Sequence, residues 1–410
     1  AFSDVLIIGE AERIWPKFLQ DYLRGEHKSE YSETDRFDLA DSPIPRYDHV
    51  TPAYMAKHWG GFIQTSRGCP YSCEFCDSQA YAGRKIRYKP VANILAEVEA
   101  LYALGRVQVI GIADDNFTAG LPRAKKILRA LRDWNRQKSK PVIFWAQFSI
   151  NLGMDNELLR LAAEAGLTNV FVGIETPNEQ SLVESNKIQN LKIDLHACVK
   201  NFHHHGIMVS SGCMVGFDHD DLSIFNTQLE FYSSMGIPSV LVWPLQVPDR
   251  TKLKERLVLE GRYLDWESNG NSDLLTANTF VPKNMSGKKL LQGAYWLIHE
   301  LYQPHRYARR FEIFFTNYAE SPFKNDISIM KPAFAFESVM MLLRTIGFIL
   351  IIAPLKEKKA VWTMTKAAFG SSHPQRFFML TTAYLTLKNA QAILRHTCPD
   401  FKQVTYPVES

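Results

Sequence analysis

The 410-residue sequence has no strong excess of charge and no long uninterrupted apolar run. Its 47 Lys and Arg residues are nearly balanced by 43 Asp and Glu residues, so the net charge of +4 gives no indication of nucleic-acid binding. The apolar stretch at residues 339–353 is interrupted by Arg344 and is shorter than the roughly 20 residues needed to span a bilayer. With 46% hydrophobic and 22% charged residues, we expect a globular protein of two or three domains.

Cysteine is also scarce. Six cysteines in a chain of this length exclude a disulfide scaffold. Three of them, Cys69, Cys73 and Cys76, fall within eight residues. This clustering is typical of metal ligands rather than of structural thiols.

The first residues predict a strand and a helix that belong to a larger unit. The first apolar run is too short for a secretory signal peptide, and we expect none in these residues. Residues 5–9 are apolar and predict a buried strand, and residues 10–23 predict a helix. A lone strand and helix cannot bury their apolar faces, so we expect the chain to start inside a domain. Pro43 and Pro45 favour an extended linker within residues 25–60.

The middle of the chain alternates between short apolar runs and helical patterns. The predicted strands are Phe62–Thr65, Val107–Ala113, Val142–Phe148, Asn169–Ile174, Met208–Val215 and Ser239–Leu245. The predicted helices between them include Ala92–Leu104, Arg123–Trp134, Asn156–Ala165 and Ser223–Met235, and glycines follow helix ends at 105, 166, 206 and 236. This alternation predicts an α/β fold with a parallel sheet, and six units could form an open barrel. In such folds the chemistry lies at the carboxyl ends of the strands.

The three clustered cysteines follow the first predicted barrel strand with the spacing Cys-x3-Cys-x2-Cys. A closed structural zinc site needs four ligands, and no fourth cysteine or histidine lies nearby in sequence. Three cysteines on a 4Fe–4S cluster would leave one iron open to an exogenous ligand. Buried structural thiols, or a zinc loop completed by a distant histidine, are the alternative interpretations.

Cys69, Cys73 and Cys76, with Phe75 before the last cysteine, resemble the signature of the radical S-adenosylmethionine (SAM) superfamily. The resemblance implies a partial (β/α)6 TIM-like barrel and a 4Fe–4S cluster whose fourth iron binds the amino and carboxylate groups of SAM. It also implies reductive cleavage of SAM to methionine and a 5′-deoxyadenosyl radical. The radical chemistry would belong to the cofactor, and the protein would position SAM and exclude water.

Polar residues at the ends of the second and third strands are candidate SAM contacts. Asp114 and Asp115 occupy the place where members of this family bind the SAM amino group, and either carboxylate could accept a charge-assisted hydrogen bond. The alternative is that they cap the following helix. Gln147 is a candidate pocket residue, with a solvent-facing or loop-capping role as its alternative.

The fourth and fifth strand ends supply two further candidates. Glu175 follows an apolar strand, where a carboxylate is unfavourable unless it is paired, and the resemblance assigns this position to the ribose hydroxyls of SAM. Its alternative is a helix cap. Gly216 lies where the family holds adenine, and a glycine permits close approach. The run His203–His205 is expected at a solvated helix end rather than in a metal site.

Further segments resemble the cobalamin-associated branch of the superfamily, which includes hopanoid C-methylases and anaerobic porphyrin-ring cyclase-like enzymes. They are the Asp-Asp-Asn-Phe segment at 114–117 and the Gly-Ile-Glu-Thr-Pro segment at 173–177. We expect the end of a cobalamin-binding-like domain and a linker at 1–40, the barrel at 41–255, and a mainly helical accessory domain at 256–410. The predicted activity is modification of an unactivated carbon, with cobalamin-dependent C-methylation as one form. A cyclase or rearrangement, or a non-catalytic iron–sulfur electron-transfer module, remains the alternative.

The predicted partners follow from this chemistry. We expect a small-molecule or lipid-like substrate and a reduced donor of the ferredoxin or flavodoxin type. Because a cluster with an open iron is oxygen-sensitive, we expect a cytoplasmic setting. Basic residues beside apolar helices at 331–396 suit a peripheral membrane surface, and amphipathic helices packed on the barrel are the alternative.

Overall fold

The computed structural model describes residues 3–51, 54, 60–105, 107–264, 279–329, 343, 347, 351, 353–397 and 405–407. The strands are β1 Leu6–Ile8, β2 Glu30–Ser32, β3 Gly60–Ile63, β4 Ser66–Arg67, β5 Arg87–Tyr88, β6 Val109–Ile112, β7 Ile143–Phe148, β8 Leu167–Glu175, β9 Met208–Val215 and β10 Ser239–Pro244. The α-helices are α1 Ala11–Arg24, α3 Ser78–Ala82, α4 Val91–Tyr102, α5 Leu121–Arg136, α6 Asn156–Ala165, α7 Glu179–Glu184, α8 Leu195–His204, α9 Ile224–Met235, α10 Lys252–Leu259, α12 Gly287–Leu301, α13 Pro304–Ala319, α15 Leu355–Ser371 and α16 Arg376–Thr397.

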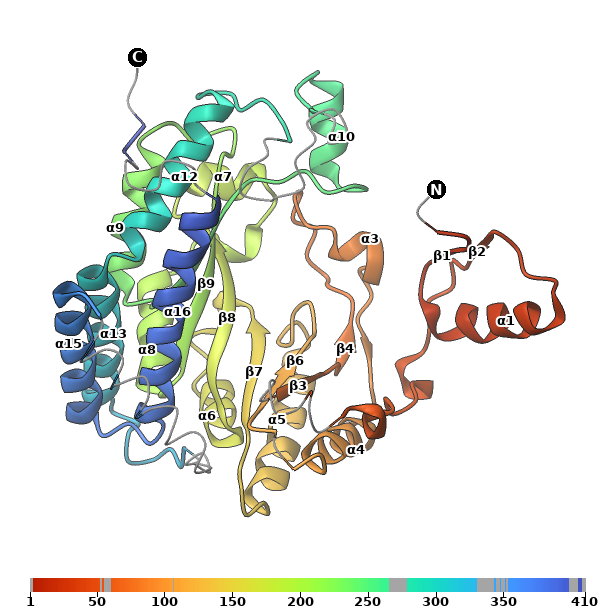
Figure 1. The fold of residues 1–410 in the computed structure, drawn as a ribbon, viewed down its shortest axis with the longest axis horizontal. Coiled ribbons are helices and arrows are strands. Elements are labelled where there is room, and N and C mark those ends of the chain that lie inside the picture. Colours follow the sequence, from red (N-terminus) through yellow and green to blue (C-terminus); the bar gives the residue numbers. More distant parts are fainter. Residues whose placement is uncertain are drawn as a thin grey trace.

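The central element is a parallel sheet of six strands in the order β10-β9-β8-β7-β6-β3. Each of the six strands predicted from the sequence overlaps one strand of this sheet. The prediction of an α/β fold with an open parallel barrel is therefore confirmed. Figure 1 shows the strands side by side in the centre of the molecule, with α4, α5, α6, α8 and α9 outside them.

Side chains alternate between two environments along each barrel strand, as the pleat requires. In β8, Val170, Val172 and Ile174 are fully buried and belong to the core between the sheet and the helices. Phe171 and Gly173 point to the opposite face, where they line or border a cavity. The helix-facing side chains each stabilise the fold by about 1.5–3 kcal/mol. The other face is left free for the site.

Helix ends follow the predicted glycines. Gly105, Gly166, Gly206 and Gly236 all have positive φ angles, between 69° and 102°. Glycine adopts this left-handed conformation without the strain that a Cβ would add. One expectation here is wrong, because His203–His205 does not form a solvated helix end. His203 and His205 are buried, and burial lowers the pKa of His203 to about 3.

The N-terminal segment forms a small unit beside the barrel, in which β1 and α1 confirm the predicted strand and helix. Residues 25–60 differ from the expected extended linker, because β2 lies there and pairs parallel with β1. The antiparallel hairpin of β4 and β5, which the sequence analysis did not identify, flanks the cysteine loop. Figure 1 shows β1, α1 and β2 in red beside α3 and β4, on the side opposite the C-terminal helices.

Helices α12, α13, α15 and α16 form the C-terminal part and pack against the barrel. Arg310 of α13 is fully buried and donates hydrogen bonds to the carbonyls of Ile237 and Pro238, at the start of β10. The domain boundaries at residues 40 and 255 stay a prediction. Most of the apolar stretch at 339–353 lies outside the described residues. Among the helices that the structure does describe, none is long and apolar enough to cross a membrane.

Candidate active site at the carboxyl ends of the strands

The cysteine loop runs from β4 to α3 at the mouth of the barrel. Cys69, Cys73 and Cys76 are all partly exposed and form no disulfide. Burial raises the pKa of the Cys69 thiol to about 11, and the neighbouring Cys76, Cys73 and Asp115 act in the same direction. A metal centre here would have to displace the thiol protons. In the described part of the chain, no three His, Cys, Asp or Glu side chains form a site for a single metal ion.

Asp114 anchors the strand that leads into this loop. It is 1% exposed, and its carboxylate accepts hydrogen bonds from the Thr65 backbone N–H at 2.7 Å, the Ser66 hydroxyl at 2.7 Å and the Thr65 hydroxyl. Neither Asp114 nor Asp115 caps the next helix, because α5 begins at Leu121 without a side-chain cap. Asp114 therefore ties the end of β6 to the start of the cysteine loop, and its oxygens are already engaged.

Glu175 forms a buried ion pair beside the cysteines. The Lys187 Nζ lies 2.7 Å from the Glu175 Oε1, and the side chains are 9% and 11% exposed. Burial alone would lower the pKa of Lys187, but the charge of Glu175 and the sulfurs of Cys73 and Cys76 more than offset it, so that this pKa is raised. The pair therefore sits within electrostatic range of the loop. Lys187 gave no signal in the sequence analysis.

The backbone at Glu175 is strained and held in place by amide side chains. Glu175 has φ 68°, a left-handed conformation that a non-glycine residue adopts at a cost of about 1–2 kcal/mol. Gln228 donates to the Glu175 carbonyl at 3.0 Å, and Asn190 donates to the Gly173 and Ile174 carbonyls. The next helix, α7, is capped by Asn178, so the helix-cap role considered for Glu175 is not observed.

A cavity of about 440 Å³ lies beside Glu175, at the carboxyl ends of the barrel strands. Its lining comes from β8, β9 and β10, including Glu175 and Phe171, and from the cysteine loop, which supplies Phe75. Gly212 is essential to its shape, because a Cβ there would lie 2.7 Å from the Glu175 Oε2. A Cβ at Gly173 would lie 2.5 Å from the Glu175 Oε1. Gly173 and Gly212, which are paired across β8 and β9, thus make room for the Glu175 carboxylate. The sequence analysis did not predict this role for them.

Two side chains extend the site toward the cysteine sulfurs. The Gln189 side-chain amide lies 3.5 Å from the Cys73 Sγ, as a donor to sulfur. The Lys187 ammonium lies 5.6 Å from the centre of the Phe75 ring, within range of a cation–π interaction. A cation and an amide donor therefore lie beside the cysteine loop, and both suit an anionic iron–sulfur cluster bound by its thiols.

Gly216 follows β9, and its expected place beside the adenine of SAM stays a prediction. Its φ is 106°, and a Cβ would lie 2.9 Å from Leu290 of α12, so the glycine permits packing with the C-terminal helices. Asp220 fixes this turn by accepting from the Gly216 and Phe217 backbone N–H groups at 2.9 and 3.1 Å. Burial raises the pKa of Asp220 to about 7, despite these bonds and one from Ser181.

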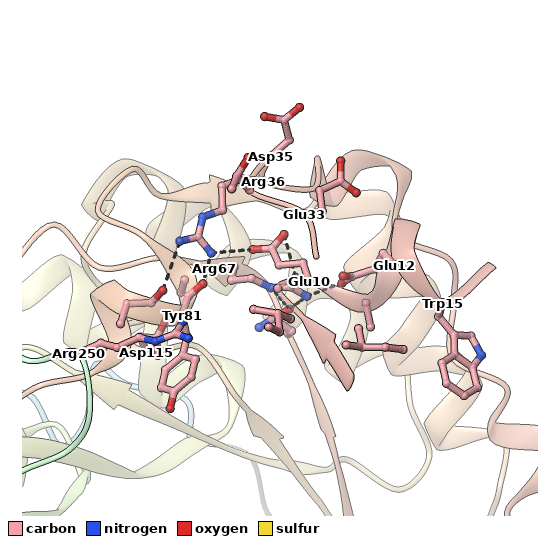
Figure 2. Close-up of a pocket in the computed structure, with 18 of the residues that line it drawn as sticks. Glu10, Glu12, Trp15, Glu33, Asp35, Arg36, Arg67, Tyr81, Asp115 and Arg250 are labelled. Carbon is pink, nitrogen blue, oxygen red and sulfur yellow. Dashed lines mark hydrogen bonds and ion pairs between the residues drawn. The ribbon is translucent and has the colours of Figure 1, made fainter. Parts of the chain in front are cut away.

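A second and larger cavity, of about 1390 Å³, lies between the N-terminal segment and the barrel mouth. Asp115 is exposed and lines it, as do Tyr81 and Arg250. Figure 2 shows Asp115 and Arg250 beside Tyr81, apart from the dashed network of Glu10, Arg36 and Arg67. Gln147 is half-buried and is not among the residues that line either cavity.

The turn after β10 contains a non-glycine residue in the left-handed backbone conformation. The sequence reads Pro248-Asp249-Arg250-Thr251, and Arg250 adopts φ 60°. Thr251 then starts α10, with its hydroxyl accepting from the Lys254 N–H and donating to the Pro248 carbonyl. An arginine therefore adopts a conformation that glycine favours, and Arg250 lines the large cavity.

The fold, the cysteine loop and the strand-end carboxylates agree with a comparison to known families. Residues 63–227 match the radical SAM superfamily, and residues 251–397 match a domain of unknown function. Residues 63–227 therefore form a radical SAM domain.

Within that superfamily, the similar proteins include named methyltransferases. An uncharacterized methyltransferase of Synechocystis is 35% identical over 315 residues, which cover 76% of this chain and 57% of that protein. Hopanoid C-2 methylase of Rhodopseudomonas palustris is 31% identical over 277 residues, or 66% of this chain and 52% of the methylase. The chain thus spans little more than half the length of these relatives.

Solved structures with the same fold include OxsB, a cobalamin-dependent S-adenosylmethionine radical enzyme. It aligns with 97% of this chain and 68% of its own length, at a TM-score of 0.54 and 15% identity. The methyltransferase TsrM from Kitasatospora setae covers 62% of this chain at a TM-score of 0.53 and 16% identity. At these identities the likeness shows the fold alone.

Proposed function

We propose that this chain carries the catalytic site of a radical SAM enzyme that modifies an unactivated carbon. The observation that carries the proposal is that Phe75 and Asp77 of the cysteine loop line one cavity together with Glu175, the partner of Lys187. A 4Fe–4S cluster bound by Cys69, Cys73 and Cys76 would supply the electron that cleaves SAM. The chain's own residues would orient SAM and exclude water from it.

The polar groups of the site match the functional groups of SAM. The 440 Å³ cavity, with Phe75 on its wall, is proposed to hold the nucleoside. Glu175 has the acceptor oxygens that ribose hydroxyls need. Lys187 supplies a buried positive charge for the methionine carboxylate, and Asp115, exposed beside Cys69, supplies a negative charge for the ammonium group. Asp114, whose oxygens are engaged, is proposed to position the loop instead.

The form of the reaction that we propose is cobalamin-dependent C-methylation. The large cavity between the N-terminal segment and the barrel mouth supports it, because about 1390 Å³ exceeds the volume of an ordinary small-molecule site. The similar hopanoid C-2 methylase supports C-methylation, and the similar OxsB, a cobalamin-dependent enzyme, supports the use of cobalamin. Bound methylcobalamin would supply the methyl group, and each turnover would yield S-adenosylhomocysteine and 5′-deoxyadenosine. Cyclisation without methyl transfer is the second candidate.

A lipid-like substrate and a membrane surface are part of the proposal. Helix α15 exposes one stripe of residues opposite its buried face: Leu355, Lys359, Trp362, Lys366 and Phe369. Alternating lysines and large apolar side chains suit the headgroup region of an anionic bilayer. We expect Trp362→Ser/Phe369→Ser to reduce sedimentation with vesicles containing phosphatidylglycerol. Lys126→Glu, an exposed change on α5, is the control, and equal sedimentation of all variants would remove this part.

The test of the central proposal is anaerobic reconstitution with iron and sulfide, followed by dithionite and SAM. Wild type should form 5′-deoxyadenosine, and Cys73→Ala should form none. Glu175→Gln should raise the KM for SAM about tenfold or more, because one charged hydrogen-bonding group is worth more than 1.4 kcal/mol. Glu179→Gln, the same change at an exposed position on α7, should behave as wild type.

Two outcomes would contradict the proposal. Product from Cys73→Ala would show that the cysteine loop does not support the chemistry. A full cluster in wild type without SAM cleavage would favour the non-catalytic iron–sulfur module. Supplying methylcobalamin and measuring S-adenosylhomocysteine then separates methylation from cyclisation. Dithionite stands in here for the ferredoxin- or flavodoxin-type donor that we propose.

A further inference from the structure

The hairpin that leads into and out of the cysteine loop has an unfavourable charge pair. Arg67 of β4 and Arg87 of β5 are directly opposite each other in the antiparallel register. Their side chains are only 20% and 13% exposed. Like charges directly opposite in a ladder are destabilising, and partial burial reduces the screening by water. The hairpin therefore needs an anion from elsewhere in the molecule.

Glu10, in the turn between β1 and α1, supplies that anion. Its carboxylate accepts two hydrogen bonds from Arg87, at 2.6 and 2.7 Å, and one from the Phe37 backbone N–H at 2.8 Å. It also lies 3.3 Å from Arg67 and 3.7 Å from Arg36. Figure 2 shows Glu10 at the centre of this network. A single carboxylate of the N-terminal segment is thus shared by three arginines.

These arginines hold both ends of the cysteine loop. Arg67 precedes Cys69 by two residues, at the entry to the loop. At the exit, Arg87 donates to the Ala82 carbonyl, and Arg36 donates to the Tyr81 carbonyl of α3. Arg87 and Arg36, which neutralise Glu10, therefore also bind the backbone carbonyls at the loop exit. Loss of Glu10 would remove the carboxylate that Arg87 and Arg36 share at the loop exit, while Arg67 at the entry would keep Glu12 at 2.7 Å.

We infer that Glu10 is a positioning residue that couples docking of the N-terminal segment to the conformation of the cysteine loop. The consequence for catalysis rests on the proposed function, but the coupling itself does not. Because the same segment lines the large cavity, a ligand that draws the segment toward the barrel would also stabilise the loop. Glu10 therefore links the occupancy of the large cavity to the conformation of the cysteine loop.

The test compares amide hydrogen exchange in wild type, Glu10→Gln and Glu33→Gln. Glu33 lines the same cavity but its described ion pair is with Arg13, so it is a matched control. In the chain as isolated, Glu10→Gln should speed exchange in peptides covering residues 66–88 about tenfold or more, the factor that corresponds to about 1.4 kcal/mol. Exchange in β8 and β9 should not change, and Glu33→Gln should match wild type.

A second variant tests the charge argument. Arg67→Gln added to Glu10→Gln removes one of the two opposed charges, so exchange should return part of the way to the wild-type rate. A further increase, or no effect of Glu10→Gln on residues 66–88, would overturn the inference. After reconstitution, Glu10→Gln should lose iron to a chelator several-fold faster than Glu33→Gln. Failure of SAM cleavage in wild type, with this exchange pattern intact, would instead count against the proposed function.

Discussion

Two charge clusters contact the cysteine loop, one on the barrel side and one on the N-terminal side. On the barrel side, Lys187 and Glu175 form a one-to-one ion pair under a cavity. On the N-terminal side, Glu10 is shared by Arg36, Arg67 and Arg87 and by a backbone N–H group. A simple pair can be opened by a ligand that offers one carboxylate and two hydroxyls. The oxygens of the Glu10 carboxylate are already bound by several donors. Glu10 therefore serves to fix the backbone.

The largest expected effect comes from breaking the barrel-side pair. Lys187→Met should lower the free energy of unfolding by about 3–5 kcal/mol, because it leaves the Glu175 carboxylate buried and unpaired. The measurement is urea denaturation of the metal-free chain. Lys187→Met/Glu175→Gln is the control and should recover much of the loss. If the single variant is as stable as wild type, the pair is not desolvated as the structure indicates.

Two carboxylates near the site, Asp220 and Glu10, should differ in the sign of their pH response. The folded-state pKa of Asp220 is raised from 3.8 to about 7, mainly by burial and also by nearby Glu184, so its contribution to stability falls as pH rises from about 4 to 7. Relative to Asp220→Asn, wild type should lose about 2–3 kcal/mol between pH 5 and pH 7. Denaturation at both pH values measures this. A constant difference between the two proteins would contradict it.

Glu10 should respond in the opposite direction. Burial would raise its pKa, but hydrogen bonds from Arg87 and Phe37 and the charges of Arg87 and Arg67 outweigh burial, so the pKa is lowered. A lowered folded-state pKa gives stability that is present above the unfolded value of 4.5 and is lost as pH falls through the folded value. Exchange of residues 66–88 in wild type should therefore approach that of Glu10→Gln only in acid.

A smaller effect is expected from filling the barrel-side cavity. Gly212→Ala places a Cβ 2.7 Å from the Glu175 Oε2, so we expect a loss of about 1–3 kcal/mol and weaker SAM binding. Gly370→Ala is the control, since nothing lies within 4 Å of the added Cβ there. Isothermal titration with SAM on the reconstituted chain checks the binding. Unchanged affinity for Gly212→Ala would place SAM elsewhere.

The smallest effect concerns Arg250, which lines the N-terminal cavity outside the Glu10 network. Arg250→Gly should raise stability by about 0.5 kcal/mol. This is the difference between left-handed strain of about 1–2 kcal/mol and the extra chain entropy of glycine, about 0.5–1 kcal/mol. Thermal denaturation is the measurement. Destabilisation by more than 1 kcal/mol would mean that the Arg250 side chain makes contacts that outweigh its strain.

Local patterns predicted the barrel because its signals are local. Alternating apolar runs, helical periodicity and glycines at helix ends each lie within a few residues, and the strands of the sheet follow in sequence order. The cysteine spacing is equally local. The roles of adjacent residues were less accessible: Asp114 and Asp115 point in different directions along one strand end, and the sequence does not say which one faces inward.

The sequence by itself determined the order of strands, the position of the cysteine loop and the superfamily. Only the tertiary structure decided which side chains meet around that loop. Lys187 follows helix α7 and meets Glu175 at the end of β8, and Glu10 meets Arg87 across 77 residues of chain. Gly212 leaves room for the Glu175 carboxylate, which approaches it from the neighbouring strand. The physical reason is that burial and charge pairing depend on distance in space, which no short stretch of sequence encodes.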